Sequence, residues 1–339
     1  MQTKRIELEN HSPIDIGRSV AGSMAADYIA GSGDPKRTLI VTDREVAGYY
    51  LKEFTDSFAG KGFVPAHIIV DGNASSKTLD TLTAVYERLY DLDCSYVIAL
   101  GGGGVIDIAT FAASTFGRGV KTLLVPTTLL SMLESVMMSH ATLHFQSQKD
   151  IIRVPVQTSY SVIDVAYLKT LPHRYIANGI AQLIQYGLID NPGLLHALAS
   201  AKDVAALVEE GLRSGDRIRK IQPELLAFGR DIADAIEGHF RFLKYTPGEA
   251  LALSLLAMCH SAALHKLFEQ LGLPVKLTEV GKDALLKRIA KSLEKQGSEV
   301  SLIRIGPEKK PIVQTVPLEA AVRYYDSALS EICHKAGET

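Results

Sequence analysis

The chain has 339 residues, of which 47% are hydrophobic and 22% charged, and its formal net charge is −2. This length predicts two domains, each large enough to bury a core of its own. The 36 Lys and Arg residues against 38 Asp and Glu leave no charge excess for non-specific binding to nucleic acid or a membrane surface. The high apolar fraction excludes low-complexity disorder.

The cysteine count and the first residues indicate a compartment. Cys94, Cys259 and Cys333 are an odd number without CxxC spacing, so we expect neither a disulfide framework nor a zinc knuckle. The opening MQTKRIELENHSP lacks the apolar core of a secretory signal. No apolar run reaches the ~18–20 residues of a membrane span. We therefore expect a cytoplasmic protein with no nucleic-acid or membrane partner.

Strand and helix patterns alternate in the first half of the chain. The predicted strands are 37–43, 63–72, 95–101 and 121–130, and the predicted helices are 44–62, 78–93 and the segment that follows the four glycines 101–104. Strands that alternate with helices of this length predict a parallel sheet covered by helices on both faces. Continuous apolar runs such as YVIAL are typical of strands buried on both sides.

The pattern changes near the segment LKTLP, 168–172. Beyond it, five long segments are helical by period and by their Leu and Ala content: 174–189, 193–222, 225–243, 248–272 and 283–297. One short strand-like piece, 299–306, precedes a last helix from Leu318. We predict an α/β domain over 1–170 and an α-helical domain over 171–339.

The glycine run Gly101–Gly104 lies where a strand ends and a helix begins. Ligands of open parallel sheets bind beyond the carboxyl ends of the strands. Backbone without side chains at that point lets N–H groups and a helix N-terminus approach a pyrophosphate. A tight strand-to-helix turn without a ligand is the alternative interpretation.

The wider sequence supports the first interpretation. The segment ALGGGGVIDIATFAASTFGRGVKTLLVPTTLL, 99–130, resembles the signature of the 3-dehydroquinate synthases, which are NAD-dependent sugar-phosphate cyclases related to the iron-containing alcohol dehydrogenases. Further resemblances follow in the same order, in LIVTDREVAGYYL, VDGNASSKTLDTL, YLKTLPHRYIANGIAQLIQYGLID, LLAFGRDIADAIEGHF and PGEALALSLL. The resemblance implies a Rossmann-like domain, followed by a helical domain.

The resemblance also implies NAD as cofactor, with residues that would contact it. Asp43 would hydrogen-bond the adenosine ribose, and Lys77 matches a lysine of the next loop, whose register is shifted by one extra residue. The other matching residues form the pyrophosphate turn, a hydroxyl pair and the adenine side: Gly102, Gly103 and Asp107; Thr127 and Thr128; Thr170 and Leu171.

The metal site of the family has no counterpart in these residues. By position, its glutamate ligand is here Gln182, and its two histidine ligands are Arg230 and Pro247. A further histidine, to which the family assigns proton transfer, is Asp234. The substrate-binding positions also differ, and they are occupied by Gln185, His140, Glu134, Pro223 and Ala227. Only Lys149 keeps a basic residue, with Asp150 after it in place of asparagine.

These replacements oppose metal binding. Zinc needs at least three thiolate, imidazole or carboxylate ligands from the protein, whereas Gln182 offers a neutral carbonyl and Pro247 offers nothing. The guanidinium of Arg230 stays protonated. At about 4 Å and an effective dielectric of 20, it would repel a dication by roughly 8 kcal/mol. We therefore expect no divalent metal at the family position.

Two alternatives remain for this region. Metal ligands have moved to His239, His260, His265 or Cys259, or Arg230 forms a salt-bridged polar pocket with Glu134, Asp234 and Glu249. The candidate catalytic residues are Lys149, Asp234 and His140, of which Asp234 or His140 would serve as a base.

Three functional hypotheses follow. The leading one is a divergent homologue of the 3-dehydroquinate synthases that binds NAD without the metal-dependent cyclisation. The second is an active cyclase or polyol dehydrogenase with an unconventional site, and the third is a non-catalytic scaffold or regulatory subunit. A small molecule such as a phosphorylated sugar would be the substrate. The resemblance further implies a homodimer.

Overall fold

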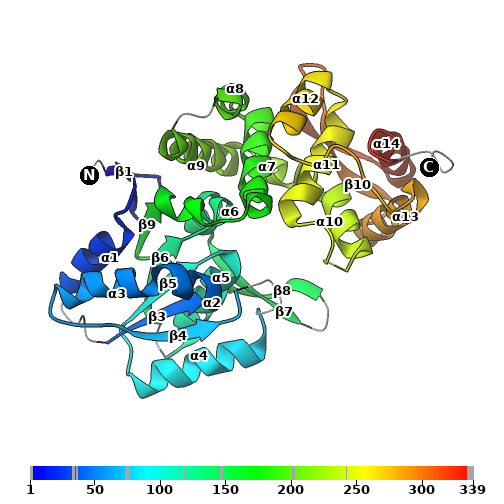
Figure 1. Cartoon of the computed structure of the whole chain (residues 1–339). Helices are drawn as coiled ribbons and strands as arrows, with labels where there is room; N and C mark the ends of the chain where they lie inside the picture. Colours follow the sequence, from blue (N-terminus) through cyan, green and yellow to red (C-terminus); the bar gives the residue numbers. More distant parts are fainter. Residues whose placement is uncertain are drawn as a thin grey trace. The chain divides into compact units, whose positions relative to one another are not determined.

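The computed structural model describes residues 3–32, 35, 37–72, 77–117, 119–145, 148–200, 203–241 and 243–333. The chain divides into two compact units (Figure 1). The first contains 1–171 together with 204–209, and the second contains 172–203 and 210–339. Among the described residues, no helix combines the length and the apolar character that crossing a membrane requires.

The first unit is built on one mixed sheet. Within the described residues its seven strands run in the order β1-β2-β9-β6-β5-β3-β4. Their bounds are Lys4–Ile6 (β1), Ile14–Gly17 (β2), Thr38–Asp43 (β3), Ala66–Val70 (β4), Tyr96–Gly101 (β5), Lys121–Pro126 (β6) and Tyr160–Asp164 (β9). All neighbours pair in parallel except β1 and β2. The predicted α/β fold with a parallel sheet is therefore confirmed.

Helices cover both faces of this sheet (Figure 1). Their bounds are Ala21–Ala30 (α1), Arg44–Val46 (α2), Lys52–Ala59 (α3), Leu79–Asp91 (α4), Gly103–Thr115 (α5) and Leu129–Leu133 (α6), with a π-helical turn Ala47–Leu51 (η1) and 3-10 turns Ser135–Met137 (η3) and Val165–Lys169 (η4). One core joins α4 and α5 to Leu39, Val41, Val97 and Ala99. Successive side chains of a strand point to opposite faces of the sheet. The strand residues that alternate with these four therefore point to the other face, where α1 packs on α3.

A hairpin that the sequence patterns did not predict packs on the same core. Strands His140–Phe145 (β7) and Gln148–Pro155 (β8) pair antiparallel, apart from the main sheet. Ala141 and Leu143 of β7 are fully buried in the cluster that contains α5. The hairpin is thereby held against the helix that follows the glycine run.

The second unit is mostly helical and also holds a β-hairpin. Its helices are His173–Ile189 (α7), Gly193–Ser200 (α8), Val204–Ile221 (α9), Arg230–His239 (α10), Pro247–Cys259 (α11), Ala262–Gln270 (α12), Lys282–Leu293 (α13) and Leu318–Leu329 (α14), with 3-10 turns Pro223–Ala227 (η5) and Glu294–Gln296 (η6). The first residues of α9, 204–209, group with the first unit. Strands Glu299–Ile305 (β10) and Pro311–Pro317 (β11) pair antiparallel, and only β10 was predicted.

Three of the predicted long helices are broken, and one of them, 193–222, is divided into α8 and α9. His260 takes a left-handed conformation with φ 46° at the end of α11, and Ser261 then caps α12. Gly229, with φ 89°, separates η5 from α10. The expected continuation of the last helix beyond residue 333, and the loop residues 73–76, lie outside the described residues.

Helices α7 and α11 meet at a point where no side chain fits. A Cβ on Gly248 would lie 2.1 Å from the Cα of Asn178, whose side-chain oxygen accepts the Gly248 N–H at 2.9 Å. The start of α11 is therefore fixed against α7 by backbone contact.

We predict that Gly248→Ala lowers the free energy of unfolding by at least about 2 kcal/mol, because backbone must move to make room. Gly281→Ala is the control, since a Cβ there meets nothing within 4 Å and its φ is −80°. Urea titrations followed by circular dichroism measure both. Equal midpoints for the two variants would contradict the close contact.

Candidate functional site

The carboxyl ends of the parallel strands bring most of the predicted cofactor residues to one edge of the sheet. Asp43 ends β3, Gly102 and Gly103 follow β5, and Thr127 and Thr128 follow β6. The Thr127 N–H donates to the Gly101 carbonyl at 3.0 Å. This is the edge at which open α/β sheets bind ligands.

The glycine turn leaves the N-terminus of α5 open. Gly102 is the N-cap residue and supplies no side chain to the first N–H groups of the helix. A Cβ on Gly102 would lie 3.2 Å from Thr128 Cγ2, whereas one on Gly101 would lie 2.6 Å from Val105 Cβ. The glycine turn is therefore closely packed against Val105 and Thr128. The N–H groups at the start of α5 are arranged as in helix N-termini that bind pyrophosphates.

Asp43 is held at the end of β3 by its own helix. Its carboxylate caps α2 by accepting the Val46 N–H at 2.9 Å, and the residue is buried. A Cβ on Gly72 would lie 2.6 Å from the Asp43 side chain. Glycine at 72 thus makes room for this carboxylate at the edge.

Lys77 and Asp107 meet in a buried cluster that also contains residues of the β7–β8 hairpin. The Lys77 ammonium lies 2.6 Å from Asp107 Oδ2, donates to Thr142 Oγ1 at 2.7 Å and also donates to Asp150 Oδ1. Thr142 in turn donates to Asp150 at 2.7 Å, and the His144 N–H donates to the Lys77 carbonyl. One cation is therefore shared by two carboxylates.

The two acids of this cluster differ in pKa direction. Burial raises the pKa of Asp107, and the neighbouring Lys77 charge offsets this only in part. Burial would also raise the pKa of Asp150, but hydrogen bonds from Lys77 and Thr142 together with the Lys77 charge lower it. Asp150 has a positive φ of 56°, so its backbone strain is tolerated where its carboxylate meets Lys77.

The hairpin separates the two candidate catalytic residues that it carries. His140 is exposed at the open end of the hairpin, where it pairs with Pro155 and its Nδ1 lies 2.9 Å from Ser139 Oγ. Lys149 lies next to Gln148, which pairs with Phe145 near the turn. The hairpin therefore does not bring His140 and Lys149 together.

The predicted adenine-side residues end the first unit. Thr170 is exposed and its hydroxyl lies 2.5 Å from the hydroxyl of Tyr50. Leu171, half-buried, is the last residue before the second unit. Tyr50, Thr142 and Gly72 were not singled out from the sequence.

In the second unit, two of the metal-ligand positions are in contact. Arg230 Nη2 donates to Gln182 Oε1 at 3.5 Å, and Gln182 Nε2 donates to Gln185 Oε1 at 2.7 Å. Gln185 Nε2 donates to the carbonyls of Phe228, at 2.7 Å, and Leu226, at 3.2 Å. Gln182 and Gln185 are both buried.

Two residues expected near Arg230 have local roles at the start of α11. Glu249 is paired with Arg174, which donates to its two oxygens at 2.9 and 2.8 Å, and it completes a capping box with Thr246. Pro247 is the first residue of α11, a position that favours proline. Asp234 is exposed on α10, and Glu134 belongs to the first unit.

Two of the histidines considered as relocated ligands lie next to glutamates. His260 Nδ1 lies 3.0 Å from Glu331, and His265 Nδ1 lies 3.7 Å from Glu269. Within the described ranges, no group of three or more His, Cys, Asp or Glu residues is placed to hold a metal ion.

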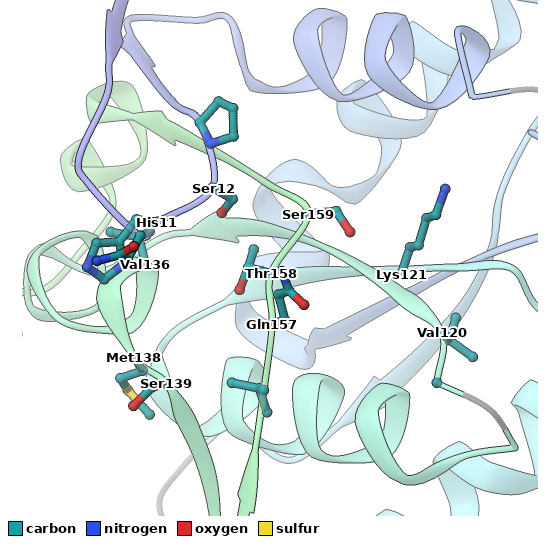
Figure 2. Close-up of a pocket in the computed structure, with 14 residues that line it drawn as sticks. His11, Ser12, Val120, Lys121, Val136, Met138, Ser139, Gln157, Thr158 and Ser159 are labelled. Carbon is teal, nitrogen blue, oxygen red and sulfur yellow. The ribbon is translucent and has the colours of Figure 1, made fainter.

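Figure 2 shows the lining of a pocket of about 880 Å³. The pocket lies at the amino ends of the strands, whereas the glycine turn follows the carboxyl end of β5. Its lining includes Ser12, Lys121 and Ser159, near the amino ends of β2, β6 and β9. None of the predicted site residues lines it. The carboxyl edge, where the chemistry-bearing residues gather, is therefore the stronger candidate for the cofactor.

Comparisons with known proteins agree with this arrangement. A family model described as 3-dehydroquinate synthase N-terminal matches residues 67–178. The 3-dehydroquinate synthase of Clostridium kluyveri is 28% identical over 325 residues, which cover 88% of this chain and 90% of that protein. That of Desulforamulus reducens is 29% identical and covers 82% and 86%. The chain is therefore similar to 3-dehydroquinate synthases over most of its length.

Solved structures show the same fold. A 2-epi-5-epi-valiolone synthase from Streptomyces hygroscopicus, solved with NAD+ and Zn2+, aligns with a TM-score of 0.78 at 19% identity and covers 97% of this chain and 98% of that one. A 2-deoxy-scyllo-inosose synthase, solved with carbaglucose-6-phosphate, NAD+ and Co2+, aligns with a TM-score of 0.79 at 18% identity over 96% and 99%. The predicted resemblance to the 3-dehydroquinate synthases and the predicted fold are confirmed.

We predict that Lys77→Met lowers the free energy of unfolding by roughly 3 kcal/mol, because Asp107 and Asp150 lose their shared cation. This is the low end for a broken buried pair, since the Asp150 side chain is 41% exposed. Chemical denaturation measures the change. Lys52→Met is the control, because the exposed Lys52–Asp56 pair should leave the midpoint unchanged.

The lowered pKa of Asp150 predicts a pH dependence with a definite sign. Its contribution to stability is present above the unfolded pKa of about 4 and is lost as pH falls through the lower folded pKa. The stability difference between wild type and Asp150→Asn should therefore shrink below about pH 4. Denaturation midpoints of both proteins from pH 7 to pH 3 measure it, and a difference that stays constant would contradict the assignment.

Proposed function

We propose that this chain binds NAD at the carboxyl edge of its first unit and has lost the metal-dependent cyclisation of its family. The hydrogen-bonded series Arg230–Gln182–Gln185 carries the second half of this proposal. The first half is supported by the open helix N-terminus at Gly102 and by the two neighbouring structures solved with NAD+.

The direction of each hydrogen bond in the series is determined by chemistry. The backbone carbonyls of Leu226 and Phe228 only accept, so the Gln185 amide nitrogen must face them. Its oxygen then faces Gln182, which must donate, and the Gln182 oxygen faces the guanidinium, which only donates. Every amide group is therefore used in one orientation.

This arrangement does not fit a divalent metal at the family position. The one ligand-like atom, Gln182 Oε1, is neutral and already accepts from a cation. A metal bound there would lie close to the fixed positive charge of Arg230, and the Pro247 ring supplies no donor atom. A glutamate at 182 would place two oxygens opposite each other, because a carboxylate has no N–H to give Gln185.

The residues of the first unit do fit a dinucleotide. The N–H groups at the start of α5 would hold the pyrophosphate, Asp43 would accept from a ribose hydroxyl, and Thr127 and Thr128 line the same edge. When bound, NAD supplies hydride acceptance. This chain's residues would bind and orient it, and Lys149, His140 and Asp234 stay candidates for moving a proton.

We predict that NAD and ADP-ribose bind to the purified protein with one site per chain by calorimetry. Saturation with Zn2+ or Co2+ followed by desalting should leave no stoichiometric metal, and formation of 3-dehydroquinate should be undetectable. One retained metal per chain, or catalytic formation of 3-dehydroquinate, would overturn the proposed loss and favour an active synthase. Absence of NAD binding would overturn the first half and favour a non-catalytic scaffold.

Variants of Arg230 provide a second test of the proposed loss of metal binding. Arg230→Ala should destabilise the fold by more than about 1 kcal/mol, because the buried Gln182 oxygen loses its donor. The double variant Gln182→Glu with Arg230→His should retain measurable Co2+ where wild type retains none, with Lys52→Met as a surface control. An Arg230→Ala variant with the same free energy of unfolding as wild type would contradict the structural role of this hydrogen-bonded series.

A further inference from the structure

The helix after β3 contains an irregular turn that carries two tyrosines. Between α2 and α3 the chain makes the π-helical turn η1, Ala47–Leu51. Such turns are rare and often occur at functional sites, because they change which residues face a neighbouring segment. Tyr49 is 64% exposed, whereas Tyr50 is half-buried.

Tyr50 contacts the turn that follows β9. Its ring centroid lies 4.4 Å from that of Tyr167, with the planes tilted by 51°. Its hydroxyl lies 2.5 Å from Thr170 Oγ1, and either hydroxyl can be the donor in this pair. The Tyr167 carbonyl oxygen lies 3.4 Å from the Tyr50 hydroxyl and 3.3 Å from Thr170 Oγ1, so the hydroxyl that accepts in the pair can donate to it. One side chain therefore holds both the ring of Tyr167 and the hydroxyl of Thr170.

The strand order gives this contact its significance. Strands β6 and β5 lie between β9 and β3, so the contact joins two segments that leave the sheet three strand spacings apart, about 14 Å. The glycine turn and Thr127–Thr128 follow the two strands in between. A dinucleotide with its pyrophosphate at Gly102 and a ribose on Asp43 has its adenosine end toward β3, on the side of Tyr50.

We propose that Tyr50 is a positioning residue for the adenosine half of a bound dinucleotide. It holds the turn 165–171 in one conformation before the ligand arrives, through its hydroxyl on Thr170 and its ring on Tyr167. Pre-ordering removes the entropy cost that binding would otherwise carry. This inference rests on the proposed NAD binding and adds a residue and a ligand moiety to it.

The chain supplies a matched control in the adjacent residue. Tyr49 is also a tyrosine of η1, but its one recorded ring contact is with Tyr50, at 5.9 Å. Tyr50→Phe and Tyr49→Phe each remove one hydroxyl from the same turn. Only the first removes a hydrogen bond to Thr170 and Tyr167.

The test is calorimetric titration of wild type and both variants with NAD, ADP-ribose and nicotinamide mononucleotide. Tyr50→Phe should weaken NAD and ADP-ribose equally, by about three- to tenfold, since the lost pre-order corresponds to one or two side chains. Nicotinamide mononucleotide affinity should stay unchanged, and Tyr49→Phe should behave as wild type. In ligand-free Tyr50→Phe, amides 165–171 should exchange hydrogen faster.

The outcomes separate this inference from the function on which it rests. Wild-type affinity of Tyr50→Phe for ADP-ribose would overturn the inference alone. An equal loss for nicotinamide mononucleotide would also overturn it, by showing a general structural effect. If wild type binds neither NAD nor ADP-ribose, both the proposed cofactor and the role of Tyr50 are wrong.

Discussion

The buried ammonium of Lys77 connects three segments that are distant in the sequence: the start of α4, the first turns of α5 and the β7–β8 hairpin. A lone charge at this depth would be costly, so both carboxylates and the Thr142 hydroxyl are needed around it. Helix α5 carries the glycine turn at its start, and Asp107 lies one turn further along it. The position of the hairpin and the geometry of the glycine turn therefore depend on the same cluster.

In the second unit, two buried amides connect the half-buried Arg230 guanidinium to backbone carbonyls. Each member constrains the next, since reversing one amide would leave two donors or two acceptors facing each other. The replacements at 182, 185 and 230 are thus coupled, and a change at one position alone leaves a buried group without a partner.

Much of the first unit was predictable because its signals are local. Strands β3, β5 and β6 are continuous apolar runs, and each is buried on both faces as such runs predict. The β7–β8 hairpin was not predicted, since Ala141 and Leu143 pack on α5 and a local pattern does not show that partner. The break between α11 and α12 at the left-handed His260 was not predicted, because no glycine or proline stands next to it. Ser261 is a residue type that favours an N-cap, and it was the one local signal of the break.

At the candidate site, the resemblance to the family predicted which residues lie together better than it predicted the interactions they make. Gln182 and Arg230 do meet, as the ligand positions they occupy require. Glu249, interpreted as part of the same polar pocket, caps α11 and binds Arg174. The signal was present: Thr246 and Glu249 have the spacing of a capping box. The contact of Tyr50 with Thr170 joins residues 120 positions apart, which no local pattern shows.

NAD binding and metal binding, the two parts of the proposed function, differ in how many sequence changes they tolerate, and the reason is physical. Pyrophosphate binding uses backbone N–H groups and small residues, which many sequences supply once the strand-to-helix turn is kept. A metal site needs three particular side chains at once, and losing one removes most of its affinity. Under the proposed loss, a buried carboxylate at 182 would have no compensating charge, and its replacement by glutamine would be favourable. Arg230 gives the Gln182 oxygen a donor, and this contact uses no residue of the carboxyl edge of the sheet.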